Sequence, residues 1–312
     1  MPDHLDGLRA ACARVDERIR TEPAYSHTSH LLVEVGGQVV VDTHYRGPEV
    51  ADVFSVTKSV LATLVGIAVQ EGLVPDLDAP AGDLLGLPLP GQTLRHLLTM
   101  TRGCATDGPF DIDAVMALPG GWLERIAAAP AVTAPGTAFR YDNGGAHLLA
   151  AALERLVGAP LAEYADRALF APLGITDREW PRDPDGHHLG FGHLRLSAGA
   201  LAALGRLWLR QDRRLLDPDY AAAMVTAHSP GGPPEQRPYG FLIWIDPAGP
   251  LAGGWAGQHV HAVPAADAVV VTTGDPGFDP GPPPTDRLAP GWRPAHDLVV
   301  EHVLPVLTGQ PD

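Results

Sequence analysis

The sequence predicts an α+β protein in which one mixed sheet, built from both ends of the chain, carries a large helical insertion. Runs rich in β-forming residues at 31–35 and 38–45 flank the Gly36-Gly37 turn and are typical of a hairpin. Strand-like runs return near the other end of the chain, at 239–245, 258–263 and 268–273. Between them, from about residue 56 to residue 228, apolar residues recur at helical spacing.

The remaining elements follow from local patterns. A helix is expected before the hairpin, and residues 295–307 are expected to form a closing helix. The Pro- and Gly-rich stretches 229–238 and 276–294 predict surface loops. We expect a single domain over residues 1–312, with an α/β lobe at about 1–58 and 236–312 and a helical lobe at about 59–235.

Composition excludes several classes of function. The 37 acidic side chains outnumber the 22 basic ones and give a net charge of −15, so neither nucleic acid nor a membrane is an expected partner. Cys12 and Cys104 lack the spacing of a disulfide framework or a zinc site, and no cofactor-binding fingerprint occurs. The first thirty residues lack the apolar run of a secretory signal. We therefore expect a cytoplasmic protein without a cofactor.

The segment around Ser55 and Lys58 carries the first chemical signature. The two residues form Ser-x-x-Lys directly before the apolar run 60–69, and positions i and i+3 of a helix share a face. The amine of Lys58 would then reach the hydroxyl of Ser55, and burial of the helix would favour the neutral amine, which is a base. The alternative is that Ser55 only caps the helix and Lys58 is a surface charge.

Residue usage favours the catalytic interpretation. Lys58 is the only lysine of the chain, and there are six serines. A single lysine placed at random would follow one of six serines by three residues roughly 2% of the time. All other basic residues are arginines, which cannot lose their proton in a protein, whereas a buried lysine can.

A second signature follows the turn at Pro135-Gly136. Tyr141 precedes Asn143, the only asparagine, by two residues. A tyrosine near an amine can relay a proton, and an asparagine amide can orient the lysine and a substrate carbonyl. Alone, the two residues would be a core aromatic and a turn residue.

Together, Ser55-x-x-Lys58 and Tyr141-x-Asn143 resemble the serine β-lactamase and penicillin-binding-protein-like superfamily, especially its class C-like branch of family VIII esterases and 6-aminohexanoate-dimer hydrolases. Stretches 96–101 and 169–175 are similar as well, and the resemblance covers roughly residues 30 to 305. It implies an antiparallel sheet flanked by helices plus an all-α lobe. It also implies acylation of Ser55, with Lys58 and Tyr141 as catalytic residues, followed by hydrolysis.

The third motif of this superfamily is where the chain departs from its relatives. The matching stretch, residues 251–258, contains no cationic side chain, neither lysine nor histidine. The resemblance makes Gly254, Trp255 and Gly257 candidate substrate-binding residues with Asn143, and the amides of Trp255 and Ser55 a candidate oxyanion hole. Without the cation that holds a substrate carboxylate in relatives, neutral small esters or amides are the expected substrates.

Several alternatives remain open. The acyl group could pass to an alcohol or amine, as in an acyltransferase or cyclase of specialised metabolism, or stay bound, as in a β-lactamase-like or penicillin-binding sensor module. His259 and His261 alternate on a strand, so they either face a site near Trp255 or lie half-exposed. A group of three further histidines lacks supporting carboxylate or thiolate spacing, so we expect a surface loop and no metal site there: His187, His188 and His193.

Overall fold

The structure, a computed structural model, describes residues 2–210, 213–279, 281 and 284–309. Eight strands form one antiparallel sheet in the order β2-β1-β10-β9-β8-β7-β6-β5, and β3 pairs with β4 in a second, two-stranded sheet. The α+β class and the antiparallel sheet with flanking helices are therefore confirmed. The strand bounds are β1 Thr28–Val35, β2 Gln38–His44, β3 Ala51–Asp52, β4 Arg195–Leu196, β5 Ser229–Gly232, β6 Arg237–Tyr239, β7 Trp244–Asp246, β8 Gly249–Gly254, β9 Gln258–Val263 and β10 Ala268–Gly274.

The chain divides into two compact units. Unit 1 runs to Val56 and also contains Arg195–Arg210 and the residues from Asp246 onward; unit 2 contains Thr57–Leu194 and the stretch that ends at Ile245. α9 (Ala198–Arg210) lies in the sequence range expected for the helical lobe, but its contacts group it with the strands of unit 1.

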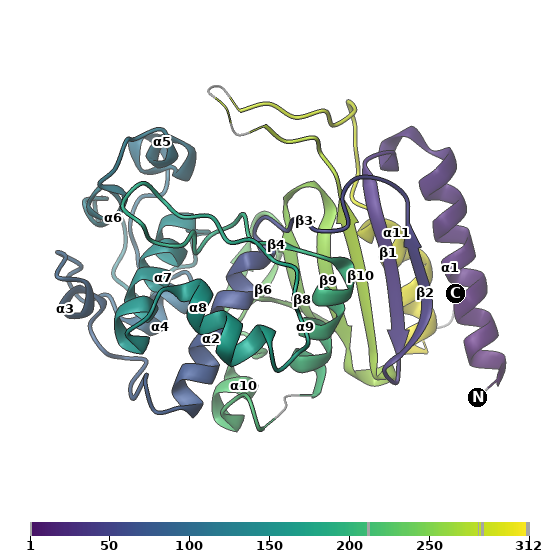
Figure 1. Ribbon diagram of the computed structural model, residues 1–312, viewed down its shortest axis with the longest axis horizontal. Coiled ribbons are helices and arrows are strands. Elements are labelled where there is room, and N and C mark those ends of the chain that lie inside the picture. The colour runs from purple at the N-terminus through teal and green to yellow at the C-terminus, as the bar shows by residue number, and fades with distance from the viewer. Residues whose placement is uncertain (1, 211–212, 280, 282–283, 310–312) are drawn as a thin grey trace. The chain divides into compact units, whose positions relative to one another are not determined.

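In unit 1, helices cover both faces of the strands. α1 (Pro2–Thr21) packs with the C-terminal helical segment on one face, and α9 lies on the other (Figure 1). That segment consists of α11 (His296–Leu298), the π-helical turn η6 (Val299–Val303) and α12 (Leu304–Thr308). The two-residue period of β10 sorts its side chains, since Val270 joins the core with α1 while Val269 lies where a Cβ on Gly205 of α9 would meet it.

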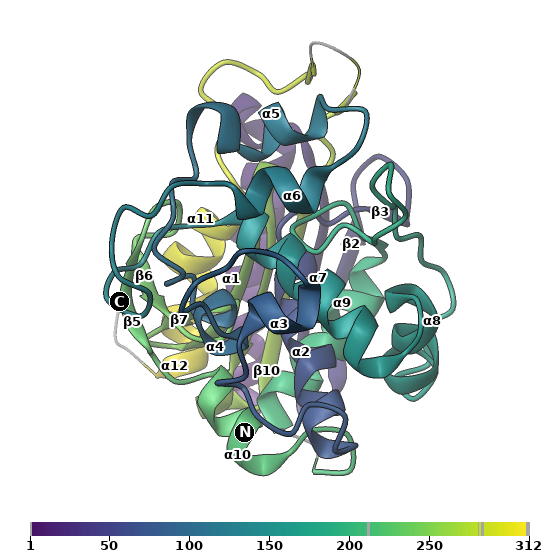
Figure 2. The same cartoon turned by 90° about the vertical axis from the view of Figure 1, so that its left-hand side faces the viewer.

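Unit 2 is built around α7 (Asn143–Val157). Figure 2 shows α7 among α3, α4, α6 and α8, all of which contact it. The side chain of Asp142 caps its first turn, and Gly158 ends it with a φ of 67°. Its neighbours are α3 (Ala81–Leu85), α4 (Leu94–Leu98), α6 (Trp122–Ala127) and α8 (Leu161–Ala165). The unit also holds α5 (Ile112–Met116), α10 (Pro218–Met224) and α2 (Val56–Gln70). Only the first residue of α2, Val56, is grouped with unit 1.

Three sequence expectations need correction. The run 239–245 is not one strand, because the backbone breaks between β6 and β7, where Gly240 N donates to Ile243 O and Leu242 has a φ of 50°. The stretch 229–238 is not only a loop, since it contains β5 and the start of β6. The closing helix contains a π-helical turn in its middle. Part of the expected loop 276–294 lies outside the described residues.

Within the part of the chain that the structure describes, no helix is both long and apolar enough to span a bilayer.

Candidate active site

Ser55 lies on the tight turn that joins β3 to the first residue of α2. Val56 N donates to Val53 O at 3.1 Å, and the side chain of Asp52 accepts from Phe54 N at 2.7 Å. Phe54 has a φ of 45°, a left-handed conformation that non-glycine residues rarely adopt. Such strain persists only where surrounding contacts fix it, and it is concentrated at functional sites. The half-buried Ser55 is therefore presented directly before a helix by a constrained backbone.

Gly254, the last residue of β8, lies against the same turn. A Cβ built on Gly254 would lie 2.6 Å from Val53 O and 3.2 Å from Ser55 N. Only glycine therefore allows the end of β8 to approach the Ser55 amide so closely. Trp255 follows with 38% of its surface exposed, and Ala256 after it has a φ of 60°.

Lys58 lies on the first turn of α2, three residues after Ser55, and is 1% exposed. Its Nζ donates to the carbonyl oxygen of Phe191 at 2.5 Å. Burial lowers the pKa of Lys58 to about 7, against the opposing effect of the nearby Asp142 carboxylate. At neutral pH a large fraction of this amine is therefore unprotonated and able to accept a proton.

Tyr141 belongs to the same surroundings. Nζ of Lys58 lies 5.0 Å from the centroid of the Tyr141 ring. The ring is stacked on Trp244, with a centroid distance of 5.9 Å and an interplanar angle of 3°. Trp244 is buried and is also in contact with Tyr239, so it fixes the plane of the Tyr141 ring.

A buried ion pair that the sequence did not predict lies beside Tyr141. Arg102 donates to the carboxylate of Asp142 and, through Nη1, to Ile126 O at 3.1 Å. The same carboxylate accepts from Gly145 N at 2.8 Å and so caps α7. Both charged side chains are almost fully buried. A charged residue between Tyr141 and Asn143 was visible in the sequence, but its partner is 40 residues away and no local pattern indicates it.

The predicted residues fall into two groups, each within one unit. Ser55 and Gly254 meet in unit 1, and Lys58 and Tyr141 meet in unit 2. Asn143 is the half-buried first residue of α7. Gly257 has a φ of 90°, and a Cβ there would lie 3.5 Å from His27 Nε2 and from Pro294 Cα.

Both expectations for His259 and His261 are wrong. Both side chains are buried, and they point to the other face of β9 from the side chain of Val260. There the ring of His259 stacks on His296 at a centroid distance of 4.4 Å. His261 Nδ1 lies 3.2 Å from His296 Nε2. They share the face covered by the C-terminal helical segment, because His259 and His261 are two residues apart on the strand.

The histidines near residue 187 contact a carboxylate. Glu154 accepts from His187 Nδ1 at 2.9 Å and from His188 Nδ1 at 2.8 Å. His188 is 2% exposed, so this part of the predicted surface loop is buried. Among the side chains that the structure places, no three of His, Cys, Asp and Glu form a group that could hold a metal ion.

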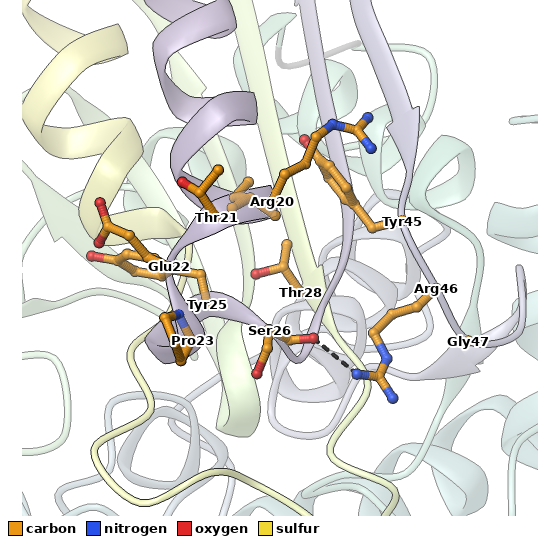
Figure 3. A pocket seen from close by; sticks show the side chains of 11 residues that line it. Arg20, Thr21, Glu22, Pro23, Tyr25, Ser26, Thr28, Tyr45, Arg46 and Gly47 are labelled. Carbon is orange, nitrogen blue, oxygen red and sulfur yellow. Dashed lines mark hydrogen bonds between the residues drawn. The ribbon is translucent and has the colours of Figure 1, made fainter.

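An open pocket of about 800 Å³ lies elsewhere in unit 1, between the end of α1 and the residues that follow β2 (Figure 3). Arg46 donates across it to Ser26 O at 2.9 Å. None of the predicted catalytic or substrate-binding residues lines it. The chemistry indicated by Ser55 and Lys58 therefore does not belong to this pocket. Its lining is Ile19, Arg20, Thr21, Glu22, Pro23, Tyr25, Ser26, Thr28, Tyr45, Arg46 and Gly47.

Comparisons with known proteins agree with these features. Esterase EstB from Burkholderia gladioli is 31% identical over 172 residues, a match that covers 46% of this chain and only 40% of the relative. The structure of EstCE1, at 18% identity, has a TM-score of 0.74 and matches 98% of this chain and 99% of its own. A penicillin-binding protein homologue from Pyrococcus abyssi, also 18% identical, has a TM-score of 0.73 and covers 96% and 78%. At such identities the structures share the fold alone. The beta-lactamase family profile, however, matches residues 23–289, most of the chain, and the protein therefore belongs to the beta-lactamase family, within the superfamily of serine β-lactamases and penicillin-binding-protein-like proteins.

Proposed function

We propose that the protein is a serine hydrolase that forms an acyl-enzyme on Ser55 and cleaves small, neutral esters or amides. One observation carries the proposal: the only lysine of the chain is buried three residues after Ser55, with a pKa lowered to about 7. A lysine kept from solvent in this way is a base at neutral pH, and the hydroxyl one helical turn earlier is the nucleophile it would activate.

Acylation begins when Oγ of Ser55 attacks the substrate carbonyl carbon and its proton moves to Nζ of Lys58. A neutral amine has one lone pair and two N–H groups, and one N–H is used by Phe191 O. The lone pair is the acceptor of the serine proton in this step. The leaving oxygen or nitrogen then takes a proton from the Tyr141 hydroxyl, which Lys58 reprotonates, and the carbonyl carbon stays bonded to Ser55.

The negative charge on the former carbonyl oxygen needs hydrogen-bond donors. The amide of Ser55 at the start of α2 is one candidate, and the amide of Trp255 is the other. The close approach of Gly254 to Ser55 N supports this assignment, because it brings the end of β8 to the nucleophile. Water, deprotonated through Tyr141 and Lys58, would then attack the acyl-enzyme and release the acid. Asn143 is proposed to orient Lys58 and the substrate.

The proposed substrate class follows from what the third motif lacks. Residues 249–257 contain no lysine, arginine or histidine, so this stretch supplies no cation for a substrate carboxylate. A relative over part of the chain, EstB, is named an esterase, which supports ester hydrolysis here.

Covalent labelling tests the proposal. A small alkyl fluorophosphonate should add one adduct to the wild-type protein at pH 8, seen as a mass shift and located on Ser55 by peptide mapping. Ser55→Ala should take no label, while Ser26→Ala, which removes an exposed serine outside the site, should label like the wild type. A wild-type protein that takes no label, or a label on another residue, contradicts the proposal.

A second candidate, acyl transfer, uses the same acyl-enzyme. One structural neighbour, EstCE1, is described as a hydrolase with promiscuous acyltransferase activity. Product analysis in water with a competing alcohol or amine separates the two, because a transferase forms mostly the transfer product. An adduct that persists for hours with a simple ester would instead favour a sensor module.

A further inference from the structure

Three aromatic side chains form a cluster within unit 1, and one of them belongs to the residue before Ser55. The rings of Phe54 and Trp255 are 5.1 Å apart with an interplanar angle of 85°, and those of Trp255 and Phe278 are 5.6 Å apart at 74°. Phe54 and Phe278 close the triangle at 5.7 Å and 76°. Each ring therefore meets the other two edge to face, in the geometry that aromatic pairs prefer.

The chain positions of two of these rings bring the cluster next to the backbone of Ser55. Phe54 directly precedes Ser55, and Trp255 directly follows Gly254, the residue whose Cβ would lie 3.2 Å from Ser55 N. The third, Phe278, comes from the segment that follows β10. Two backbones that converge on the Ser55 amide thus each carry an aromatic ring, and a third segment adds another.

Exposure differs within the cluster. Phe54 is 7% exposed and forms its buried side, whereas Trp255 is 38% exposed and Phe278 is half-buried. Four large hydrophobic side chains are exposed in the part of the chain that the structure describes, and only that of Trp255 is aromatic. Exposed apolar surface next to a reactive group is unfavourable in water unless a ligand covers it.

We propose that Phe54, Trp255 and Phe278 form a binding surface for an aromatic or bulky alkyl group of the substrate, next to the scissile carbonyl. The inference rests on the proposed function, because it takes Ser55 as the nucleophile. It names the chemical class of the substrate: uncharged esters or amides with a phenyl-sized group on the acyl or on the alcohol side. Ring-to-ring contact and exclusion of water from Trp255 provide the binding energy.

Three esters with the same reacting group test this surface. Methyl acetate is the reference, methyl phenylacetate carries the aromatic group on the acyl side, and benzyl acetate carries it on the alcohol side. Hydrolysis is followed by titration of the released acid. The wild type should prefer one of the two aromatic esters over methyl acetate in kcat/KM by about ten-fold or more. The preferred ester identifies the side of the carbonyl that the surface binds.

Variants connect the preference to the rings. Trp255→Ala and Phe278→Ala should each lower the ratio of kcat/KM for the preferred aromatic ester to kcat/KM for methyl acetate by about ten-fold, because each removes a ring that only the aromatic ester contacts. Trp255→Phe should keep most of the preference. Val39→Ala, which truncates an exposed hydrophobic side chain on β2, is the matched control and should behave as the wild type.

The outcomes separate this inference from the proposed function. If Ser55 still takes the fluorophosphonate label and both alanine variants keep the wild-type ester preference, the aromatic surface is refuted and the hydrolase stands. If the wild type is not labelled, the proposed function fails first. Equal labelling and equal melting temperatures of wild type and variants show that a lost preference does not come from misfolding.

Discussion

At the scale of single residues, the side chain of Lys58 determines how activity should vary with pH. Only its neutral form accepts the Ser55 proton, and burial lowers its pKa from 10.5 to about 7. We expect kcat/KM to rise about ten-fold per pH unit below pH 7 and to level off above it. A profile measured from pH 5 to pH 10 checks this, and a midpoint near 10 would show that the amine is not desolvated.

The arginine variant is the sharpest control for that profile. Lys58→Arg keeps the positive charge but cannot deprotonate in this range. We expect kcat/KM to fall by about a thousand-fold or more at every pH, as for loss of the base that activates a nucleophile. Measurable activity with the wild-type pH midpoint in this variant would place the base elsewhere.

Substitutions of the two members of the Arg102–Asp142 ion pair should shift the pH midpoint of kcat/KM in opposite directions. The Asp142 carboxylate raises the pKa of Lys58, so Asp142→Asn should move the midpoint to lower pH. Arg102→Gln should move it to higher pH, because it removes the cation that balances this carboxylate. Removing one member of a buried pair costs roughly 3–5 kcal/mol of stability, because it leaves the other charge buried without a partner. The double variant, which removes both charges, therefore serves as the folding control. Midpoints that shift the same way in both single variants would contradict this electrostatic account.

At the scale of elements, the end of β8 must approach the start of α2 for the Ser55 amide to work. Gly254→Ala would place a methyl group 3.2 Å from Ser55 N and 2.6 Å from Val53 O, although φ at this residue is extended and open to alanine. We expect kcat/KM to fall by about a hundred-fold, the usual effect of losing an oxyanion donor. The control is Gly199→Ala on α9, where a Cβ would meet only Ser197 Oγ at 3.9 Å. Equal activity of the two variants would mean that the close approach at Gly254 has no catalytic role.

The elements that were predicted correctly have strong local patterns. In β9 apolar residues alternate with polar ones, and β10 contains a continuous apolar run, each bounded by turn residues. Gly36-Gly37 marks the hairpin of β1 and β2. The break between β6 and β7 was missed, because Leu242 takes a positive φ where its amide donates to Leu98 O, a long-range contact. The face of β9 that holds His259 and His261 could not be assigned, since the helix that covers it lies more than 30 residues later.

The candidate site shows the same limit. Ser55 and Lys58 were found because helical spacing makes them neighbours through the chain itself. The contact of Lys58 with Tyr141 was expected only through the resemblance to a known superfamily, and its contact with Phe191 O joins residues 133 positions apart. Backbone carbonyls carry no residue-specific signal, so no sequence pattern could have indicated that acceptor.

At the scale of the whole molecule, a buried amine that catalyses also destabilises the fold. The pKa of Lys58 is about 7 in the folded protein and 10.5 when exposed, so the unfolded chain binds the proton more tightly. The penalty is therefore full below about pH 7 and fades as the pH rises toward 10.5. Each unit of lowering corresponds to about 1.4 kcal/mol, which makes the penalty a few kcal/mol at neutral pH.

Replacing the lysine by an apolar side chain should therefore stabilise the protein while it abolishes activity. Methionine has a similar length, but it leaves the Phe191 carbonyl without the donor that Lys58 provides, at a cost of about 1 to 3 kcal/mol. We expect Lys58→Met to unfold at higher denaturant concentration than the wild type at pH 6, where the charged amine is most costly. The difference should shrink or change sign at pH 10, where the wild-type amine is neutral in the fold. Unfolding curves at the two pH values measure this directly, and a variant that is less stable than the wild type at pH 6 would show that the amine is well solvated, which the catalytic proposal cannot accommodate.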